Sequence, residues 1–437
     1  MCDYGYTDWG VGLHKKYKDI ILHITLVSCY NNHMGYTKRT LWGVSWTLGL
    51  QGITKLIGLL KILVLARFLT PVQFGIFGIA SLMLTLLETL TETGVNVFLV
   101  QEKEDVRVHL DSAWIVSIGR GIVISVVLLF TAPAVADFFH SPSATGVILL
   151  ISIVPFLRGF INPSEVIFQK ELQFNKEFYF RAGLLLVDGL TSISLALITH
   201  SVFSIVFGQI FSVSAEIIVS FLIFKERPRF KLHNEYISKI FHRGKWITLA
   251  GVFNYLFLNF DDFVVGRLLN ATQLGFYQMA YRFSVYPVIQ LFDMFAKVTL
   301  PVYVKISYDM SRLKRAFIRT IATVILSLLF ALSMWLLAPF VVNIILGSNW
   351  LDIVPVIRVL LFVAVMRGIY GLTTTLLFAL KKQEYVTLVT LINFLAIAVF
   401  IFPMVTQYGI IGAAYAVSIG SVIGLLPQVY YVYKVFN

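Results

Sequence analysis

Long apolar stretches alternate with short polar ones along most of the chain. A helix that crosses a membrane needs about 20 predominantly apolar residues. Windows of roughly that length predict about twelve spanning helices, near residues 41–65, 74–99, 112–135, 146–168, 177–198, 202–224, 246–268, 274–302, 317–340, 354–379, 385–405 and 409–432. We therefore expect an all-α polytopic membrane protein.

The composition agrees with this pattern. Of the 437 residues, 58% are hydrophobic and only 13% are charged, whereas a soluble domain has about 25% charged residues. The net charge is +12, which in a soluble protein could indicate nucleic-acid binding. That interpretation needs a soluble basic patch, so we exclude nucleic acid as a partner.

Basic residues concentrate in the loops on one side of the predicted helices. They are Lys170, Lys176, Arg181, Lys225, Arg227, Arg229, Lys231, Lys239, Arg243, Lys245, Lys305, Arg312, Lys314, Arg315, Arg319, Lys381 and Lys382. The opposite loops, at 140–146, 199–202, 347–352 and 406–409, contain neither Lys nor Arg. The positive-inside rule then places both termini in the cytoplasm.

The first 33 residues differ from the rest, because their apolar run at 20–30 is too short to span a membrane. They also contain both cysteines, Cys2 and Cys29, so a disulfide framework is excluded. We interpret this extension as untranslated, with synthesis starting at Met34, or as a disordered or interfacial tail. A peptide from upstream of Met34 in mass spectra of the native protein would contradict the first interpretation.

One sequence occurs twice. ARFLTPVQFGIFGIA begins at Ala66 and joins the first and second predicted helices, and GRLLNATQLGFYQMA begins at Gly266 and joins the seventh and eighth. The repeat predicts two parallel six-helix halves around a central cavity, related by an axis along the membrane normal. The halves would span 34–224 and 246–437, joined by a cytoplasmic linker with an amphipathic helix at 225–245.

We call these two segments the repeated corners, and each carries an arginine and a glycine. Arg67 and Arg267 are expected to reach the membrane surface or to cap carbonyl groups of their own corner, with direct substrate contact as the alternative. Gly75 and Gly275 occupy matching positions. We expect the proline and glycine of LTPVQFG to form a tight turn.

Charged side chains inside the predicted helices need a partner or a cavity, because a charge at the bilayer centre costs about 3 kcal/mol. They concentrate in the helix pairs that carry the repeated corners, which predicts that those four helices line the cavity. The candidates are Lys55, Lys61, Glu88, Glu92, Arg120, Arg158, Asn254, Asp261, Asp262, Arg282, Asp293, Lys297 and Arg367, and Asp188 and Glu216 are further intramembrane acids.

Two of these groups allow more than one interpretation. Glu88 and Glu92 lie one turn apart and repel each other unless water or a cation is present, which favours a proton site, a sodium site or a substrate contact. Asp293 and Lys297 could instead form a structural ion pair.

Arg282 lies about 12 Å below its corner, from eight residues at 1.5 Å each. At that depth it should have a partner, for which Asp261 or Asp262 is the candidate.

Enzyme signatures are missing from the sequence, which has no Walker A, His-Glu-x-x-His or Gly-x-Ser-x-Gly motif. We expect no enzyme activity, no metal and no cofactor. Transport by such a chain would draw on an ion gradient, with a proton or sodium ion as partner, or on the gradient of the substrate itself.

Three segments carry a family resemblance, in this order: ARFLTPVQFGIFGIA, LTETGVNVFLVQEKE and NYLFLNFDDFVVGRLLNATQLGFYQMAYRFSVYP. With them the chain resembles the Wzx-type polysaccharide flippases of the multidrug/oligosaccharidyl-lipid/polysaccharide exporter superfamily. The resemblance runs from about Thr40 to the C-terminus. It implies a MATE- or MurJ-like fold in the cytoplasmic membrane. It also implies that polyprenyl-pyrophosphate-linked oligosaccharides are flipped by alternating access, with membrane lipids, a polysaccharide polymerase and chain-length machinery as partners.

Three alternatives stay open. An ion-coupled drug or metabolite antiporter of the same superfamily would use the intramembrane acids to bind an organic cation. A lipid II-type precursor flippase usually has more helices. A non-transporting scaffold of a glycan assembly complex should tolerate mutation of Glu88 and Arg282, whereas a transporter should not.

Overall fold

The computed structural model describes residues 52–54, 56–92, 106–171, 173–231 and 234–436, and in these ranges every regular element is a helix. A helix at 56–68 precedes α3. The remaining elements are α3 (Pro71–Leu90), α5 (Val106–Phe138), α6 (Ala144–Ile151), α7 (Ile153–Arg158), η1 (Pro163–Glu165), α8 (Val166–Lys170), α9 (Phe174–Thr199), α10 (Phe203–Ile223), α11 (Asn234–Leu268), α12 (Ala271–Ile306), α13 (Met310–Ile345), η2 (Ser348–Ile353), α14 (Val354–Ala379) and α15 (Gln383–Phe436). The predicted all-α fold is confirmed.

Eight described helices are long and apolar enough to cross a membrane, or nine with the bent pair α6–α7 and η1–α8. Helix α15 contains two of the predicted segments, because its backbone leaves the helical region at Gly409, where φ is 62° and ψ is −140°. Helix α11 covers the seventh predicted segment, 246–268, and the helix at 56–68 covers the end of the first, 41–65, whose residues 41–51 lie outside the described residues.

The fourth predicted span is not straight, so the prediction of one helix over 146–168 is wrong. The chain bends by 67° between α7 and η1. Asn162 fixes the bend, because its Oδ1 accepts from Ser164 N at 3.0 Å and its Nδ2 donates to Glu226 O at 2.9 Å. The Asn162-Pro163 pair is a turn signal that the sequence displays.

Each repeated corner starts a helix. At the first corner, Thr70 Oγ1 accepts from Gln73 N and the Gln73 side chain accepts from Thr70 N, which forms a capping box ahead of Pro71. At the second corner, Asn270 Oδ1 accepts from Gln273 N at 2.9 Å. The prediction that a glycine makes the turn is wrong, because Gly75 lies inside α3.

The two corner glycines let α3 and α12 cross at very short range. A Cβ added to Gly75 would lie 1.6 Å from Ala271 O, and one added to Gly275 would lie 2.1 Å from Pro71 O. The two contacts are equivalent under the repeat, because 75 matches 275 and 71 matches 271. A local two-fold axis therefore passes between the N-terminal turns of α3 and α12.

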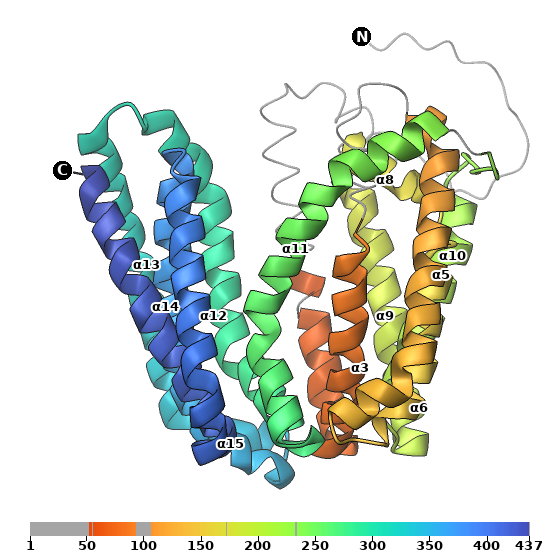
Figure 1. Ribbon diagram of the computed structural model, residues 1–437, viewed down its shortest axis with the longest axis horizontal. Helices are drawn as coiled ribbons and strands as arrows, with labels where there is room; N and C mark the ends of the chain where they lie inside the picture. The colour runs from red at the N-terminus through yellow and green to blue at the C-terminus, as the bar shows by residue number, and fades with distance from the viewer. Residues whose placement is uncertain (1–51, 55, 93–105, 172, 232–233, 437) are drawn as a thin grey trace, which may run out of the picture.

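We call the end of the bundle that carries these corners the corner side, and the end that carries the C-terminus the terminal side. We call the helices up to α10 the N-terminal half, and α11 to α15 the C-terminal half. Figure 1 shows α12 to α15 leaning toward the N-terminal half on the corner side and away from it on the terminal side, while α11 crosses between them and lies with the N-terminal helices on the terminal side. Helix α11 also runs along α3, where Tyr255 Oη donates to Leu82 O at 2.6 Å.

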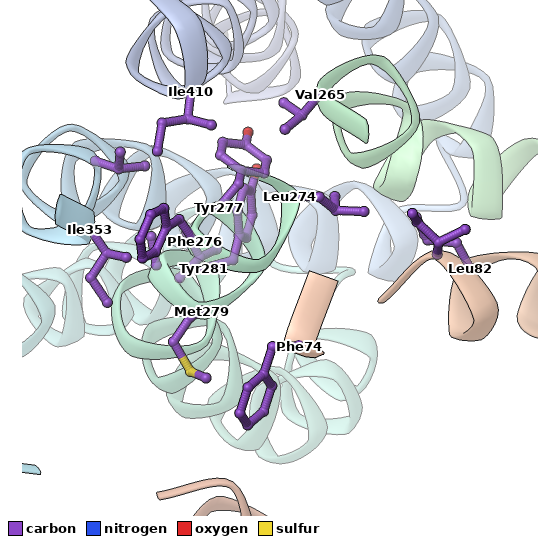
Figure 2. Close-up of a cluster of buried hydrophobic side chains, with 14 of the residues drawn as sticks. Phe74, Leu82, Val265, Leu274, Phe276, Tyr277, Met279, Tyr281, Ile353 and Ile410 are labelled. Carbon is purple, nitrogen blue, oxygen red and sulfur yellow. The ribbon is translucent and has the colours of Figure 1, made fainter. Parts of the chain in front are cut away.

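A buried apolar cluster fills the seam on the corner side. Figure 2 shows side chains from both halves in this cluster, among them Phe74, Leu82, Val265, Leu274, Phe276, Tyr277, Met279, Tyr281, Ile353 and Ile410. Trp350 of η2 is fully buried there, with ring centroids 5.3 Å from Phe74 and 5.9 Å from Phe276. Its Nε1 donates to Ala66 O at 3.0 Å, which ties η2 to the other half.

The corner arginines also join the two halves. Arg67 Nε donates to Ile345 O at 2.8 Å, and Arg267 Nη1 donates to Phe138 O at 2.7 Å. Both acceptors are the last residues of helices, α13 and α5, where unpaired carbonyl groups attract a cation. The expectation that each arginine caps its own corner is wrong, because each reaches the opposite half.

We expect Gly75→Ala to destabilise the protein by about 1–3 kcal/mol, because the new methyl group has no room against α12. Thermal unfolding in detergent, followed by size-exclusion fluorescence, measures the effect. Gly183→Ala in α9 is the control, because no atom lies within 4 Å of its added Cβ. Equal melting temperatures for the two variants would contradict the close crossing.

Candidate functional site

The sequence candidates of the N-terminal half fall into ion pairs. Lys61 Nζ contacts Asp188 Oδ1 at 2.7 Å and Oδ2 at 2.8 Å, which joins the helix at 56–68 to α9. The two side chains are only 12% and 17% exposed. Lys61 is therefore held inside its own half, by an acid 127 residues away in the chain.

Glu88 also has a partner within this half. It forms an ion pair with Arg158 of α7, and Arg120 Nη2 donates to the Glu88 carbonyl at 2.6 Å. Glu92 differs, because its side chain is exposed and its carbonyl accepts from the Thr248 hydroxyl. The two acids are thus not an equivalent pair, and Arg158 supplies the positive charge that Glu88 requires.

A second ionic group was missed by sequence reasoning. Arg181 of α9 donates to Glu165 Oε1 at 3.2 Å and to Glu216 Oε1 at 3.3 Å. The assignment of Arg181 to a cytoplasmic loop is wrong, since it lies inside α9. Glu165 was not recognised because the bend at η1, which turns it inward, was not predicted.

These groups surround a polar chamber of about 440 Å³ inside the N-terminal half. It is lined by Thr54, Arg158, Arg181, Leu184, Leu185, Asp188, Gln209, Ser212, Val213 and Glu216. A separate recess of about 690 Å³ between α6, α9 and α10 is almost wholly apolar and holds none of the candidate residues.

In the C-terminal half, the candidates gather around Asp261, which is buried at 4% exposure. Tyr277 Oη of α12 donates to Asp261 Oδ2 at 2.9 Å. The Arg367 guanidinium of α14 lies 5.6 Å from the ring centroid of Tyr281, in a cation–π contact. The two tyrosines were not predicted, because their contacts depend on how α11, α12 and α14 pack.

Arg282 lies nearby, one turn beyond Gln278 on α12. It interacts electrostatically with Tyr286 and Asp262, and the Gln278 side chain hydrogen-bonds to Asp262. An ion pair of Arg282 with Asp261 or Asp262 stays a prediction. Gln278 itself packs against Gly78 of α3, whose added Cβ would lie 2.4 Å from Gln278 Oε1. The Asp262–Gln278–Arg282 group therefore lies at the seam between the halves.

The repeat places opposite charges at one matching position. Lys61 and Asp261 are equivalent, since each lies six residues before its corner arginine, Arg67 or Arg267. Lys61 pairs with α9 of its half, and Asp261 accepts from α12 of its half. The halves share a backbone plan but differ in the chemistry of their interiors.

Four candidates remain predictions. Lys55 lies outside the described residues, and Asn254 is exposed on α11. Asp293 and Lys297 are exposed on α12, and their mutual ion pair stays a prediction. Among the described residues, no group of three or more His, Cys, Asp and Glu could hold a metal ion.

The fold and these buried charges define an all-helical polytopic membrane protein. Solved structures with this fold include the lipid II flippase MurJ, with a TM-score of 0.68 and 18% identity over 89% of this chain and 88% of that one. An inward-facing multidrug MATE transporter matches with a TM-score of 0.67 and 14% identity over 86% and 94%.

A family model described as "Polysaccharide biosynthesis protein" matches residues 64–355, so the chain belongs to that family. Lipopolysaccharide biosynthesis protein WzxC of Escherichia coli is 24% identical over 80% of this chain and 72% of its own length. A membrane protein of the cps region of Klebsiella pneumoniae is 24% identical over 92% and 84%. Succinoglycan biosynthesis transport protein ExoT of Rhizobium meliloti is 21% identical over 79% and 69%.

We expect Asp188→Asn to destabilise the protein by about 3–5 kcal/mol, because it leaves the Lys61 ammonium buried without a counter-charge. The double variant Lys61→Met/Asp188→Leu should recover most of that loss, because it removes both charges together. Thermal unfolding of the purified variants measures both effects. A double variant no more stable than the single one would contradict a purely pairwise role for these residues.

Proposed function

We propose that this chain is a flippase for polyprenyl-pyrophosphate-linked oligosaccharides in the biosynthesis of a surface polysaccharide. The observation that carries the proposal is the family match over residues 64–355, on a fold shared with a lipid II flippase. The names of WzxC and ExoT, a lipopolysaccharide biosynthesis protein and a succinoglycan transport protein, support the same substrate class.

Arg282 is the residue best suited to hold the pyrophosphate of such a substrate. It lies at the seam between the halves, and within the described chain its guanidinium has no ion-pair partner in contact. A guanidinium binds phosphate oxygens in a bidentate manner. The other arginines are engaged differently, since Arg158 is paired with Glu88 and Arg367 stacks on Tyr281.

The proposed topology places the terminal side, with both termini, in the cytoplasm of a cell with a cytoplasmic (inner) membrane. The basic loops support this placement through the positive-inside rule. The proposed halves remain 34–224 and 246–437, joined by the linker at 225–245. The closed corner side then faces outward, so the state described here admits the substrate from the cytoplasm.

Transport would proceed by rocking one half against the other. The buried charges Lys61 with Asp188 and Arg158 with Glu88 are paired within the N-terminal half, which favours movement of that half as a rigid body. We propose no enzyme activity for this chain. A proton or sodium gradient, or the gradient of the substrate, would supply the energy, and a polymerase with its chain-length machinery would consume the product.

A drug or metabolite antiporter is the second candidate. The observation that favours it is Asp262, whose Oδ1 is buried without a hydrogen-bond partner in the described chain. The fold match to a MATE transporter is compatible with this function. The antiporter function predicts that a deletion strain becomes sensitive to cationic drugs while its surface polysaccharide stays unchanged.

The flippase proposal predicts that a deletion strain accumulates lipid-linked glycan while its surface polysaccharide disappears. In complementation, Arg282→Ala should lower surface polysaccharide about 10- to 100-fold, because a hydrogen bond to a charged group contributes about 1.5–3 kcal/mol. Extraction and quantification of both glycan pools measures this.

Arg227→Ala, at an exposed position outside the spanning helices, is the matched control and should complement fully. Normal glycan pools in both the deletion strain and the Arg282→Ala strain would contradict the proposal.

A further inference from the structure

The two arginine contacts across the seam are equivalent in position but differ in chemistry. Arg67 donates to the Ile345 carbonyl, a group that does not titrate. Arg267 donates to the Phe138 carbonyl, and its Nη1 also lies 2.6 Å from His140 Nε2. The guanidinium is further held 4.9 Å from the Phe138 ring centroid.

The short Arg267–His140 contact depends on the protonation of the imidazole. A guanidinium nitrogen can only donate, so a hydrogen bond between the two requires His140 Nε2 as acceptor, which only a ring with its proton on Nδ1 alone provides. Protonation of Nε2 would remove the acceptor and place two cations 2.6 Å apart. Histidine is the side chain whose charge ordinarily changes between pH 5 and 8.

The backbone around His140 holds the ring in place. His140 follows the last residues of α5 in a left-handed conformation, with φ of 50°. Its N–H donates to Asp137 O at 3.1 Å, and Ser141 N donates to Ala136 O at 2.8 Å. These bonds fix the backbone from which the imidazole reaches Arg267.

We propose that Arg267 and His140 form an acid-sensitive latch on the corner side, which protonation of His140 releases. The inference rests on the alternating access proposed above. The latch adds to alternating access the contact that breaks, between Arg267 and His140, and the condition that breaks it, which is acidification. Arg67 and Ile345 form the second, pH-independent contact of the seam.

The charged and titratable groups around the latch are few. Asp137 is exposed at the same helix end, three residues before His140, and a released imidazolium can interact with it there. Helix α6 and the first turn of α12 carry no charged residue. Among the described residues of the C-terminal half, Arg267 faces the ring.

His200, the other histidine of the corner side, lies in a different environment. Its carbonyl accepts from Gln73 Nε2 at 2.8 Å, and its ring lies 6.3 Å from Phe68. Both neighbours belong to the N-terminal half, so protonation of His200 breaks no contact across the seam. This makes His200 a matched control for His140.

The test measures the corner-side opening directly. Cys2 and Cys29 are replaced by Ser, and spin labels are attached at Thr199→Cys and Gln407→Cys, two exposed corner-side positions in opposite halves. Double electron–electron resonance on the purified full chain then gives the distance distribution at about pH 7.5 and about pH 5.5, on either side of the ordinary histidine titration.

We expect a population at longer distance to rise roughly fivefold or more on acidification, the low end of typical coupling between sites. His140→Gln should abolish the rise, and His140→Lys should show the longer distance already at the higher pH. His200→Gln should respond like the parent protein. Size-exclusion elution confirms that each variant is folded, and if His140→Lys fails this check, His140→Gln decides.

A distance distribution that does not change with pH, or a change that survives His140→Gln, would overturn the latch. The readout needs no substrate. A normal acid response in a protein that flips no glycan would therefore reject the proposed function alone.

Discussion

The structure depends on how closely α3 and α12 approach each other. Between helices in a lipid bilayer there is no hydrophobic driving force, so close packing and hydrogen bonds must hold them together. Gly75 and Gly275 remove the side chains that would keep the backbones apart. That approach brings Trp350, Arg67 and Arg267 within reach of the opposite half, so the corner-side seal follows from two glycines.

Buried charge imposes the second constraint. Three ionic groups have their counter-charges within the N-terminal half: Lys61 with Asp188, Arg158 with Glu88, and Arg181 with Glu165 and Glu216. A half whose charges are internally paired can tilt without exposing an unpaired ion to lipid. The two arginine contacts at the seam are of another kind, since their acceptors are helix-end carbonyl groups, which can exchange a guanidinium for water or lipid headgroups.

Much of the fold was predictable because its signals are local. Apolar length predicted most of the described spans, and the repeated corner predicted the matching positions at which α3 and α12 cross. The prediction of a turn at Gly75 was wrong, because proline and glycine in LTPVQFG suggest a turn, whereas the missing side chain of Gly75 makes room for Ala271 of α12. The bend after α7 could have been found from Asn162-Pro163.

The site was predictable only as a list of residue types. Lys61 and Asp188 are 127 residues apart, and nothing in a single sequence pairs them. The partners of Arg67 and Arg267 are backbone carbonyl groups, which every residue has, so no side-chain pattern marks Ile345 or Phe138. Arg282 was recognised as a candidate site residue because a charge at its predicted depth in the membrane requires an explanation.

Reconstituted flipping tests the central claim most directly. The purified chain is placed in liposomes with a lipid-linked oligosaccharide, and an impermeant reagent measures the fraction of glycan exposed outside over time. The account predicts exposure of the inner pool with the parent protein and a 10- to 100-fold slower rate with Arg282→Ala, for loss of about 1.5–3 kcal/mol of binding. An inner pool that stays protected with the parent protein, under an imposed proton or sodium gradient as well as without one, would contradict it.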